Sequence, residues 1–285
     1  MLKRNNPKLR HKNKAFCCRT PYFLLLVFAT AWLSASAQFA QPTGARSAAM
    51  GGCTVGIDEA ASIAGAAFAE RPWVALSYSQ SYLLKGLAYS TLAAVVPTGE
   101  SGAVVAGYSH YGSTVYNEQQ AVAGYAMRLT RAIAVGATLN YLHSGTSDPY
   151  YTPQNIVTAA VAVEVRPSES VALGLHLFNP LAVRYATETE ARVPAIANVG
   201  VVYRPVPELT TALQVEKNLY SQPRFMAGLE YGFVEHLFIR TGVATAPIVY
   251  SFGFGLAWPH YKADFAVQVH QTLGVTPQLS VYYVF

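Results

Sequence analysis

The segment "HSGTSDPYY" brings together residue types that could perform nucleophilic catalysis. His143, Ser144, Ser147 and Asp148 lie close together in it, and a serine becomes a nucleophile when a neighbouring histidine takes its proton. A catalytic triad, however, draws its residues from separate elements that the fold brings together. Neighbours within one loop do not give that geometry, so we expect the protein not to be an enzyme.

A glycine-rich stretch and the cysteines offer other candidate chemistry. "GFGFGLAW" has a superficial likeness to a phosphate-binding loop, but its spacing is wrong, and we interpret it as a strand with small residues on one face. Cys17 and Cys18 fall in the leader and Cys53 remains alone, so no internal disulfide is expected. No Cys/His cluster has the spacing of metal ligands. We therefore expect no cofactor and no metal.

Charged side chains form the third candidate set. If the alternating runs of this sequence closed into a barrel, nine polar side chains would face its lumen: Arg128, Glu164, Arg204, Glu216, Arg224, Glu230, Arg240, Asp264 and Gln268. They could line a solute path, or they could pair with one another, because charges in a narrow lumen need partners. Both signs occur in comparable numbers, which favours pairing.

The composition indicates which elements carry these side chains. Hydrophobic residues make up 52% of the chain and charged residues only 12%, about half the usual charged share of a soluble domain. This combination indicates a membrane protein, yet no run of 18 apolar residues follows the leader, so helical spans are excluded. A closed barrel remains, because its alternating strands never give a long apolar run.

The pattern from Trp73 onward predicts the strands themselves. Alternating runs are separated by turn residues about every 12 to 15 positions, so the predicted fold class is all-β, a transmembrane antiparallel β-barrel of about 14 strands over residues 73–285. A soluble sandwich would also alternate, but here the second face mixes charge with Gly and Ala, as a lumen needs. The predicted strands are 73–79, 86–96, 102–110, 119–130, 132–143, 155–166, 169–178, 196–204, 208–217, 223–232, 235–245, 248–258, 260–270 and 276–285.

Residues 1–37 have the pattern of a signal peptide. A basic head precedes the apolar run "YFLLLVFATAWL", and "ASA" offers small residues for cleavage before Gln38; an uncleaved anchor is the alternative. We expect export through the inner membrane and a location in the outer membrane of a Gram-negative bacterium. The leader holds seven of the 20 Lys and Arg residues, so the remaining chain has 13 bases, 15 acids and a formal net charge of −2. Overall basicity therefore gives no argument for a nucleic-acid partner.

The two ends of the predicted mature chain have distinct patterns. Residues 38–72 are rich in small residues and are predicted to form a plug in the barrel mouth. A disordered tail is the alternative, although their low charge argues against disorder. At the other end Leu279, Val281, Tyr283 and Phe285 share one strand face. We expect the last strand to pair with the first, and Tyr283 and Phe285 to act as an assembly signal for the barrel assembly machinery.

The sequence resembles the PorV/PorQ family of outer-membrane proteins, which are similar to the FadL-type fatty-acid transporter barrels. The likeness covers nearly all of the chain after the leader. It rests on "GARSAAMGGCTVGIDEAAS", "HLFNPL", "ARVPAIANVGVVYRP", "FMAGLEYGFVEHLFIRTGV" and "SFGFGLAW…KADFAVQVHQTLGVTPQLSVYYVF". One departure is that family members commonly carry Asn-Pro-Ala after the acidic stretch, where this chain has "AGAAFAE".

The resemblance implies a non-enzymatic role in transport or as an accessory of type IX secretion. Outer-membrane lipid and secretion-system components would then be the partners. Two alternatives stay open. A FadL-like channel for hydrophobic small molecules would need an apolar internal pocket and a lateral opening. A structural surface protein would instead carry its role in the outer loops.

Overall fold

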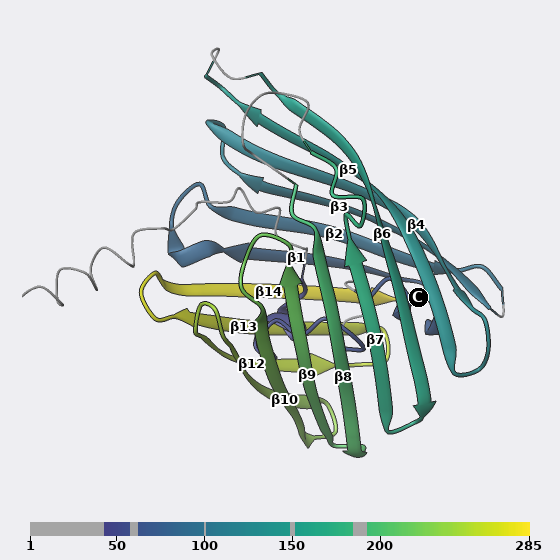
Figure 1. Ribbon diagram of the computed structural model, residues 1–285. Coiled ribbons are helices and arrows are strands. Elements are labelled where there is room, and N and C mark those ends of the chain that lie inside the picture. The colour runs from purple at the N-terminus through teal and green to yellow at the C-terminus, as the bar shows by residue number, and fades with distance from the viewer. Residues whose placement is uncertain (1–42, 58–61, 100, 149–151, 185–192) are drawn as a thin grey trace, which may run out of the picture. The chain divides into compact units, whose positions relative to one another are not determined.

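The computed structural model is a closed barrel of fourteen antiparallel strands, which confirms the predicted fold class (Figure 1). The structure describes residues 43–57, 62–99, 101–148, 152–184 and 193–285. The predicted signal peptide and its cleavage site before Gln38 lie outside these residues. The strands follow one another round the barrel: β1 Trp73–Gln80, β2 Ala88–Pro97, β3 Gly102–Gly112, β4 Tyr116–Arg128, β5 Ile133–Thr146, β6 Gln154–Ser168, β7 Val171–Phe178, β8 Ile196–Val206, β9 Leu209–Asn218, β10 Arg224–Val234, β11 Leu237–Ala244, β12 Val249–Ala257, β13 Tyr261–His270 and β14 Gly274–Val284.

The observed strands differ from the predicted ones mainly at their ends. β4 begins at Tyr116 rather than 119, and β5 ends at Thr146 rather than 143. These two strands pair as far as Tyr116 and Thr146, although the residues there are polar. Hydrogen bonding between strands does not depend on the apolar alternation that marks the membrane-facing part, so the sheet continues where the sequence pattern stops.

Pairing between the first and last strands closes the barrel. β1 and β14 pair from Trp73 and Val284 to Ser79 and Gln278, and the Phe285 amide donates to the Pro72 carbonyl at 3.0 Å. Closure leaves no strand with an unpaired edge along this seam. We call the end of the barrel with Trp73 and Val284 the terminal end, and the opposite end the loop end.

The wall of the barrel has unequal height. β5 and β6 contain 14 and 15 residues, whereas β7 and β11 contain 8 each. The long segment between β7 and β8 begins at Asn179, a fully buried residue whose side chain accepts from Thr158 Oγ1 at 2.8 Å and from the Val183 amide at 2.9 Å. Asn179 thus ties the start of this segment to the taller strand β6.

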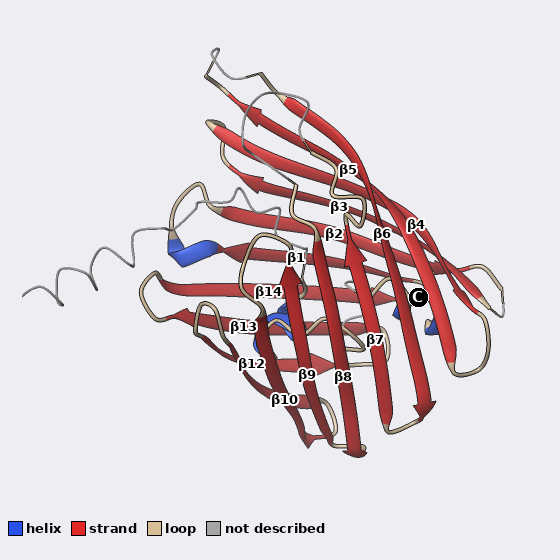
Figure 2. Cartoon of the chain, in the orientation of Figure 1, coloured by secondary structure: helices blue, strands red, loops and turns tan. Residues whose placement is uncertain are grey.

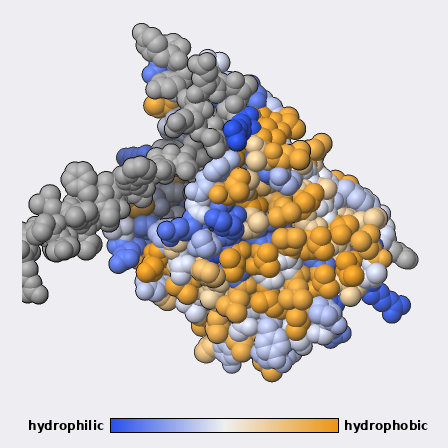
Figure 3. Space-filling view, viewed as in Figure 1, coloured by the Kyte–Doolittle hydropathy of each residue, from blue (hydrophilic) through white to orange (hydrophobic). Residues whose placement is uncertain are grey.

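Large apolar side chains cover the outer face of every strand. Figure 3 shows this band in one view, and Leu139, Leu213 and Phe252 are more than half exposed within it. An apolar surface that surrounds a whole protein is incompatible with a monomer in water. It fits the acyl region of a bilayer, where only closed barrels or helices satisfy their backbone.

The described part of the N-terminal segment lies against the inward faces of the strands. It contains the short helix α2, Ala45–Ala49, and the 3₁₀ helix η1, Gly65–Phe68; a further 3₁₀ turn, η2, spans Ser81–Leu83 (Figure 2). Ala45, Ala48 and Ala49 pack against Ala266 of β13. Among the described residues, no helix has the length and apolar character needed to cross a membrane.

Candidate functional site

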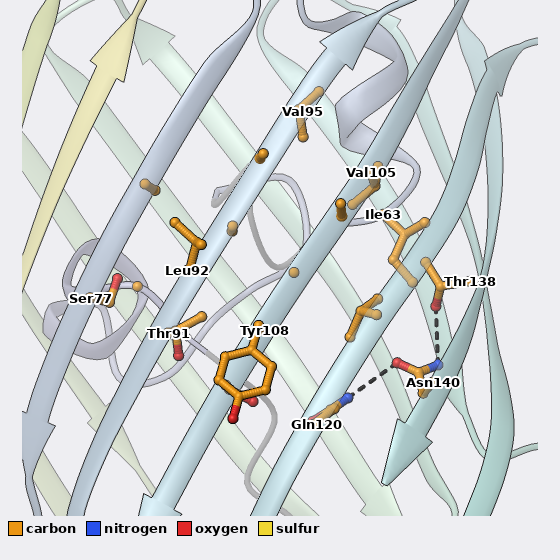
Figure 4. A pocket seen from close by; sticks show the side chains of 18 of the residues that line it. Ile63, Ser77, Thr91, Leu92, Val95, Val105, Tyr108, Gln120, Thr138 and Asn140 are labelled. Atoms are coloured by element: carbon orange, nitrogen blue, oxygen red, sulfur yellow. Dashed lines mark hydrogen bonds between the residues drawn. The ribbon is translucent and has the colours of Figure 1, made fainter.

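A cavity lies inside the barrel beside strands β1–β7. It holds about 810 Å³ of space that protein atoms do not fill, part of it open to solvent. The room arises because the inward-facing positions of β1 and β2 carry small side chains, including Ala75, Thr91 and Ala93. Ile63 of the N-terminal segment also lines the cavity (Figure 4).

The lining of this cavity is mainly apolar and carries no formal charge. Trp73, Val95, Val105 and Phe178 contribute the large apolar surfaces, and none of the described lining residues is Asp, Glu, Lys or Arg. A charged solute would lose its hydration here without gaining a charged partner, at a large cost in free energy. The cavity therefore suits an uncharged, mostly apolar solute.

A short chain of polar side chains runs along β4 and β5 at the side of the cavity. Gln120 Nε2 donates to Asn140 Oδ1 at 3.1 Å, and Asn140 Nδ2 donates to Thr138 Oγ1 at 3.2 Å (Figure 4). All three side chains are buried. The polar groups thus satisfy one another on one side of an otherwise apolar space.

The N-terminal segment is held to the other side of the lumen by hydrogen bonds to inward-facing side chains. The Thr54 and Val55 amides donate to Gln214 Oε1 of β9 at 2.8 and 3.0 Å. The Ala45 amide donates to Ser280 Oγ of β14 at 2.8 Å. These contacts attach the segment at widely separated points of the wall. Whether the segment blocks passage, as the predicted plug would, stays a prediction.

Four charged side chains form a network across strands β10, β11 and β13. Arg240 contacts Glu230 at 2.5 Å and Asp264 at 2.6 Å, and Arg46 of helix α2 contacts Glu230 at 2.6 Å. Glu230, Arg240 and Asp264 are buried. Three of the predicted lumen charges therefore pair with one another, and the fourth member comes from the N-terminal segment.

A second ion pair lies at the terminal end of β6. Glu164, which is 1% exposed, contacts Arg166 at 2.8 Å and accepts from Ser62 Oγ at 2.8 Å. Arg166 also lies over the ring of Phe68, 3.8 Å from its centre. Glu164 thus joins the wall to the N-terminal segment much as Glu230 does.

The other proposed lumen residues are partly buried and are not gathered into one site. Arg204 Nη2 donates to the Gly56 carbonyl at 3.0 Å, and Gln268 Nε2 donates to the Ala48 carbonyl at 3.3 Å. Glu216 and Arg224 lie opposite each other on β9 and β10. Arg128 is at the end of β4. The nine residues therefore belong to several contacts around the lumen, most of them away from the cavity.

The proposed assembly residues lie on the outer face. Tyr283 and Phe285 are 39% and 58% exposed, and their rings meet edge to face with centres 4.8 Å apart. The Tyr261 ring lies beside Tyr283 at 5.1 Å. This aromatic cluster is at the terminal end, and a role in assembly stays a prediction.

The other sequence candidates lie apart from the cavity. His143 Nδ1 hydrogen-bonds Asn155 Oδ1 at 2.7 Å and Ser144 Oγ donates to the Tyr116 hydroxyl at 3.5 Å, so the two side chains have different partners. The glycine-rich stretch forms β12, as interpreted from the sequence. Within the residues that the structure describes, no group of His, Cys, Asp and Glu has an arrangement that could hold a metal ion.

Sequence reasoning missed Arg46, His176 and the residues that line the cavity. Arg46 stands in the segment predicted to be a plug, and its pairing with Glu230 joins positions 184 residues apart. His176 was hidden in the run "VALGLHLF" of β7, where alternation gives its inward direction but not its neighbours. The available signal for Arg46 was a single charged residue among the small and uncharged residues of 38–57.

Comparison with known proteins shows the fold. No protein-family model and no curated protein matches the chain. Similar solved structures are the CymD monoaromatic hydrocarbon channel (12% identity, TM-score 0.64, 87% of this chain and 99% of that one) and the Pseudomonas putida toluene transporter TodX (12%, 0.63, 87% and 99%). A Pseudomonas aeruginosa FadL homologue also matches (11%, 0.62, 85% and 98%). The chain therefore has the fold of the FadL-type outer-membrane barrels, and these neighbours are transport channels rather than enzymes.

Proposed function

We propose that this protein is an outer-membrane channel for small, uncharged and mainly apolar solutes. The observation that carries the proposal is the internal cavity, which has an apolar lining without formal charge among its described residues. An inert surface protein would need no such space, because protein interiors are otherwise close-packed. The apolar pocket that the channel alternative required is thus available.

The fold supports the same proposal. The neighbours named above are described as a monoaromatic hydrocarbon channel and a toluene transporter, and a channel in this chain would use the same architecture. The channel alternative also required a lateral opening. The described residues of β1, β2 and β3, which border the cavity, pair without a register shift, so their paired backbones leave no opening there. A solute that left sideways here would have to part paired strands.

Filling the cavity tests the proposal. Ala93 faces the cavity from β2, whereas Val96 lies on the outer face of the same strand and does not line the cavity. Toluene binding to the purified barrel is followed through the fluorescence of Trp73, with Trp258→Phe as the background. Ala93→Phe should abolish saturable binding, whereas Val96→Phe should preserve it. Equal binding by both variants, or none by the parent protein, would count against a channel of this kind.

The N-terminal segment enters this proposal as the part of the chain that restricts passage. Residues 45–57 fill the lumen beside β8–β13, and the cavity lies beside β1–β7. We propose that the predicted plug acts by leaving only this side of the lumen free. The export signal, its cleavage before Gln38 and the Gram-negative outer membrane belong to the same proposal, as does assembly through Tyr283 and Phe285.

The PorV/PorQ resemblance keeps a second role under consideration. The resemblance implies accessory work in type IX secretion, and a structural surface role is a third option. The cavity favours the channel over both, because neither role requires an internal space for a small solute. Pull-down from native membranes separates them: recovery of secretion components would favour the accessory role.

A further inference from the structure

One buried side chain of the lumen lies where two cavities meet. His176 faces inward from β7 and is 7% exposed. It lines the large cavity and also a smaller one, of about 230 Å³, between β6, β7 and the N-terminal segment. Thr54, Ser62 and Glu164 are among the residues that line the smaller cavity. His176 therefore lies between a cavity without charged lining residues and a smaller one that Glu164 lines.

The hydrogen-bonding groups of His176 are not used by the protein. Neither ring nitrogen has a partner among the residues that the structure describes, although the side chain is more than nine-tenths buried. Buried polar side chains in native proteins are nearly always hydrogen-bonded, because an unpaired one loses its interaction with water. An imidazole left free at a cavity wall is thus available to a molecule inside the cavity.

A second unpaired group lies beside it. Asn198 of β8 is the direct cross-strand partner of His176 on the same inward face, and its Oδ1 is buried without a hydrogen-bond partner in the described structure. Side chains opposite each other on neighbouring strands have Cβ atoms about 5 Å apart. The imidazole, which lines the cavity, offers one donor and one acceptor, and a hydroxyl, which both donates and accepts, matches it.

We propose that His176 is a specificity-determining residue, which binds the hydroxyl group of small, uncharged and otherwise apolar solutes held in the large cavity. The inference rests on the proposed channel function and narrows its solute class. The apolar body of the solute lies against the wall formed by residues such as Phe178 and Ile63. Its hydroxyl then reaches the imidazole at the junction.

Phenol and toluene test this inference, because they have nearly the same shape and differ in one hydroxyl. Binding of each is measured by titration of the reconstituted barrel, with Trp73 fluorescence as the signal and Trp258→Phe as the background. The wild-type residue should give phenol the tighter binding once partition into the lipid is subtracted. His176→Phe keeps a ring but no hydrogen-bonding group, and should weaken phenol binding about fivefold with little effect on toluene. His176→Gln restores a polar group and should recover part of the loss.

The outcomes separate the inference from the function on which it rests. If the His176→Phe variant loses phenol and toluene binding together, the residue is only part of the wall, and the inference fails while the channel stands. If the parent protein binds phenol and toluene equally well, the inference also fails and the channel stands. If the parent binds neither probe, the proposed function fails and the inference with it. Heat-modifiable migration on gels shows that each variant is a folded barrel.

Discussion

Arg240 depends on a neighbour without a side chain. Its ion pair with Asp264 joins β11 to β13 and crosses the intervening strand β12 at Gly255. A Cβ at position 255 would collide with both the Arg240 guanidinium and the Asp264 carboxylate. The glycine in "GFGFGLAW" therefore makes room for a buried ion pair, which explains the small lumen-side residue that the sequence pattern indicated.

Glu230 is the residue on which this network depends, because it neutralises both Arg46 and Arg240. Glu230→Gln leaves a buried guanidinium without its carboxylate. Removing one partner of a buried pair typically costs about 3 to 5 kcal/mol, and we expect a loss in the free energy of unfolding at the lower end, because Asp264 remains. Reversible unfolding in bilayers measures it.

Glu216→Gln is the matched control for this prediction. Glu216 faces inward from β9, next to β10, and forms no ion pair within the described residues. Its substitution should lower the free energy of unfolding much less. Equal losses in the two variants would mean that the network adds nothing beyond the burial of a carboxylate.

Cys53 gives a stability change with a definite pH dependence. Burial raises the pKa of this thiol from its ordinary 9.0 to about 12, with the Arg224 charge opposing the shift. The folded state therefore keeps its proton where the unfolded state loses it. The stabilising contribution is complete below about pH 9 and is lost as pH rises towards 12, by up to about 1.4 kcal/mol per pH unit.

The comparison with Cys53→Ala isolates this contribution. The difference in free energy of unfolding between the two proteins should be constant from pH 7 to pH 8. Between pH 9 and pH 11 the wild-type protein loses stability relative to the variant. The difference should then fall by at least about 0.7 kcal/mol per pH unit, half of the maximum slope. A difference that stays flat through this range would show that the thiol is not buried.

Among the elements, the inward glycines of β10 and β11 determine where the N-terminal segment can lie. A Cβ at Gly228 would come within 2.5 Å of the Met50 carbonyl oxygen and 2.6 Å of its Cβ, and a Cβ at Gly242 would meet the backbone of Met50 and Gly51. The two glycines thus leave room for the backbone of the N-terminal segment against the inner faces of β10 and β11. Close approach of this kind is one reason for glycine within a strand.

Gly228→Ala should therefore displace the segment. Overpacking of this type costs about 1 to 3 kcal/mol, and we expect residues 45–57 to become accessible to protease and Cys53 to react faster with a thiol reagent. Gly232→Ala on the same strand is the control, because a Cβ there meets nothing closer than 3.6 Å. Fast cleavage in the parent protein would contradict the packed segment altogether.

The elements also show how far the sequence could lead. All fourteen strands were predictable, because the period of two is repeated in each and the lipid imposes it from outside. The contacts of the N-terminal segment were not, since Arg46–Glu230 and Thr54–Gln214 join distant positions and leave no periodic trace. The cavity could not be predicted from the sequence for a similar reason. Ala75 and Ala93 are ordinary strand residues, and they create space only because the closed barrel places them beside each other.

At the scale of the whole molecule, the lumen is divided into two unlike halves. Beside β8–β13 it is filled by the N-terminal segment and crossed by ion pairs. Beside β1–β7 it is uncharged at the level of the cavity and partly empty. The filled half holds the N-terminal segment, and the other half provides the space, so one chain can combine a packed barrel with a binding site.

This division requires that alternate side chains of each strand face the lumen and the lipid. Two neighbouring residues of β13 test that assignment. Val267 of β13 lies between its cross-strand partners Phe252 and Pro277 on the lipid face, whereas Gln268 faces inward and donates to the Ala48 carbonyl. An arginine on the lipid face near the middle of the bilayer costs about 2 to 4 kcal/mol, and lumen positions tolerate charge. Val267→Arg should lower the free energy of unfolding by that amount. Gln268→Arg should lower it less, although it loses the bond to the N-terminal segment.

Reversible unfolding of both variants in bilayers decides the matter, with Val267→Leu as the control for a change of shape alone. A soluble sandwich would also suffer from Val267→Arg, so refolding is repeated without lipid or detergent. The apolar band around all fourteen strands requires an apolar solvent, and we expect no folded protein in plain buffer. Folding there would refute the membrane barrel. If Gln268→Arg proves the more damaging substitution in lipid, the inward and outward faces assigned to β13 are wrong. The assignment of its neighbouring strands is then wrong as well, since paired residues share one side of a sheet.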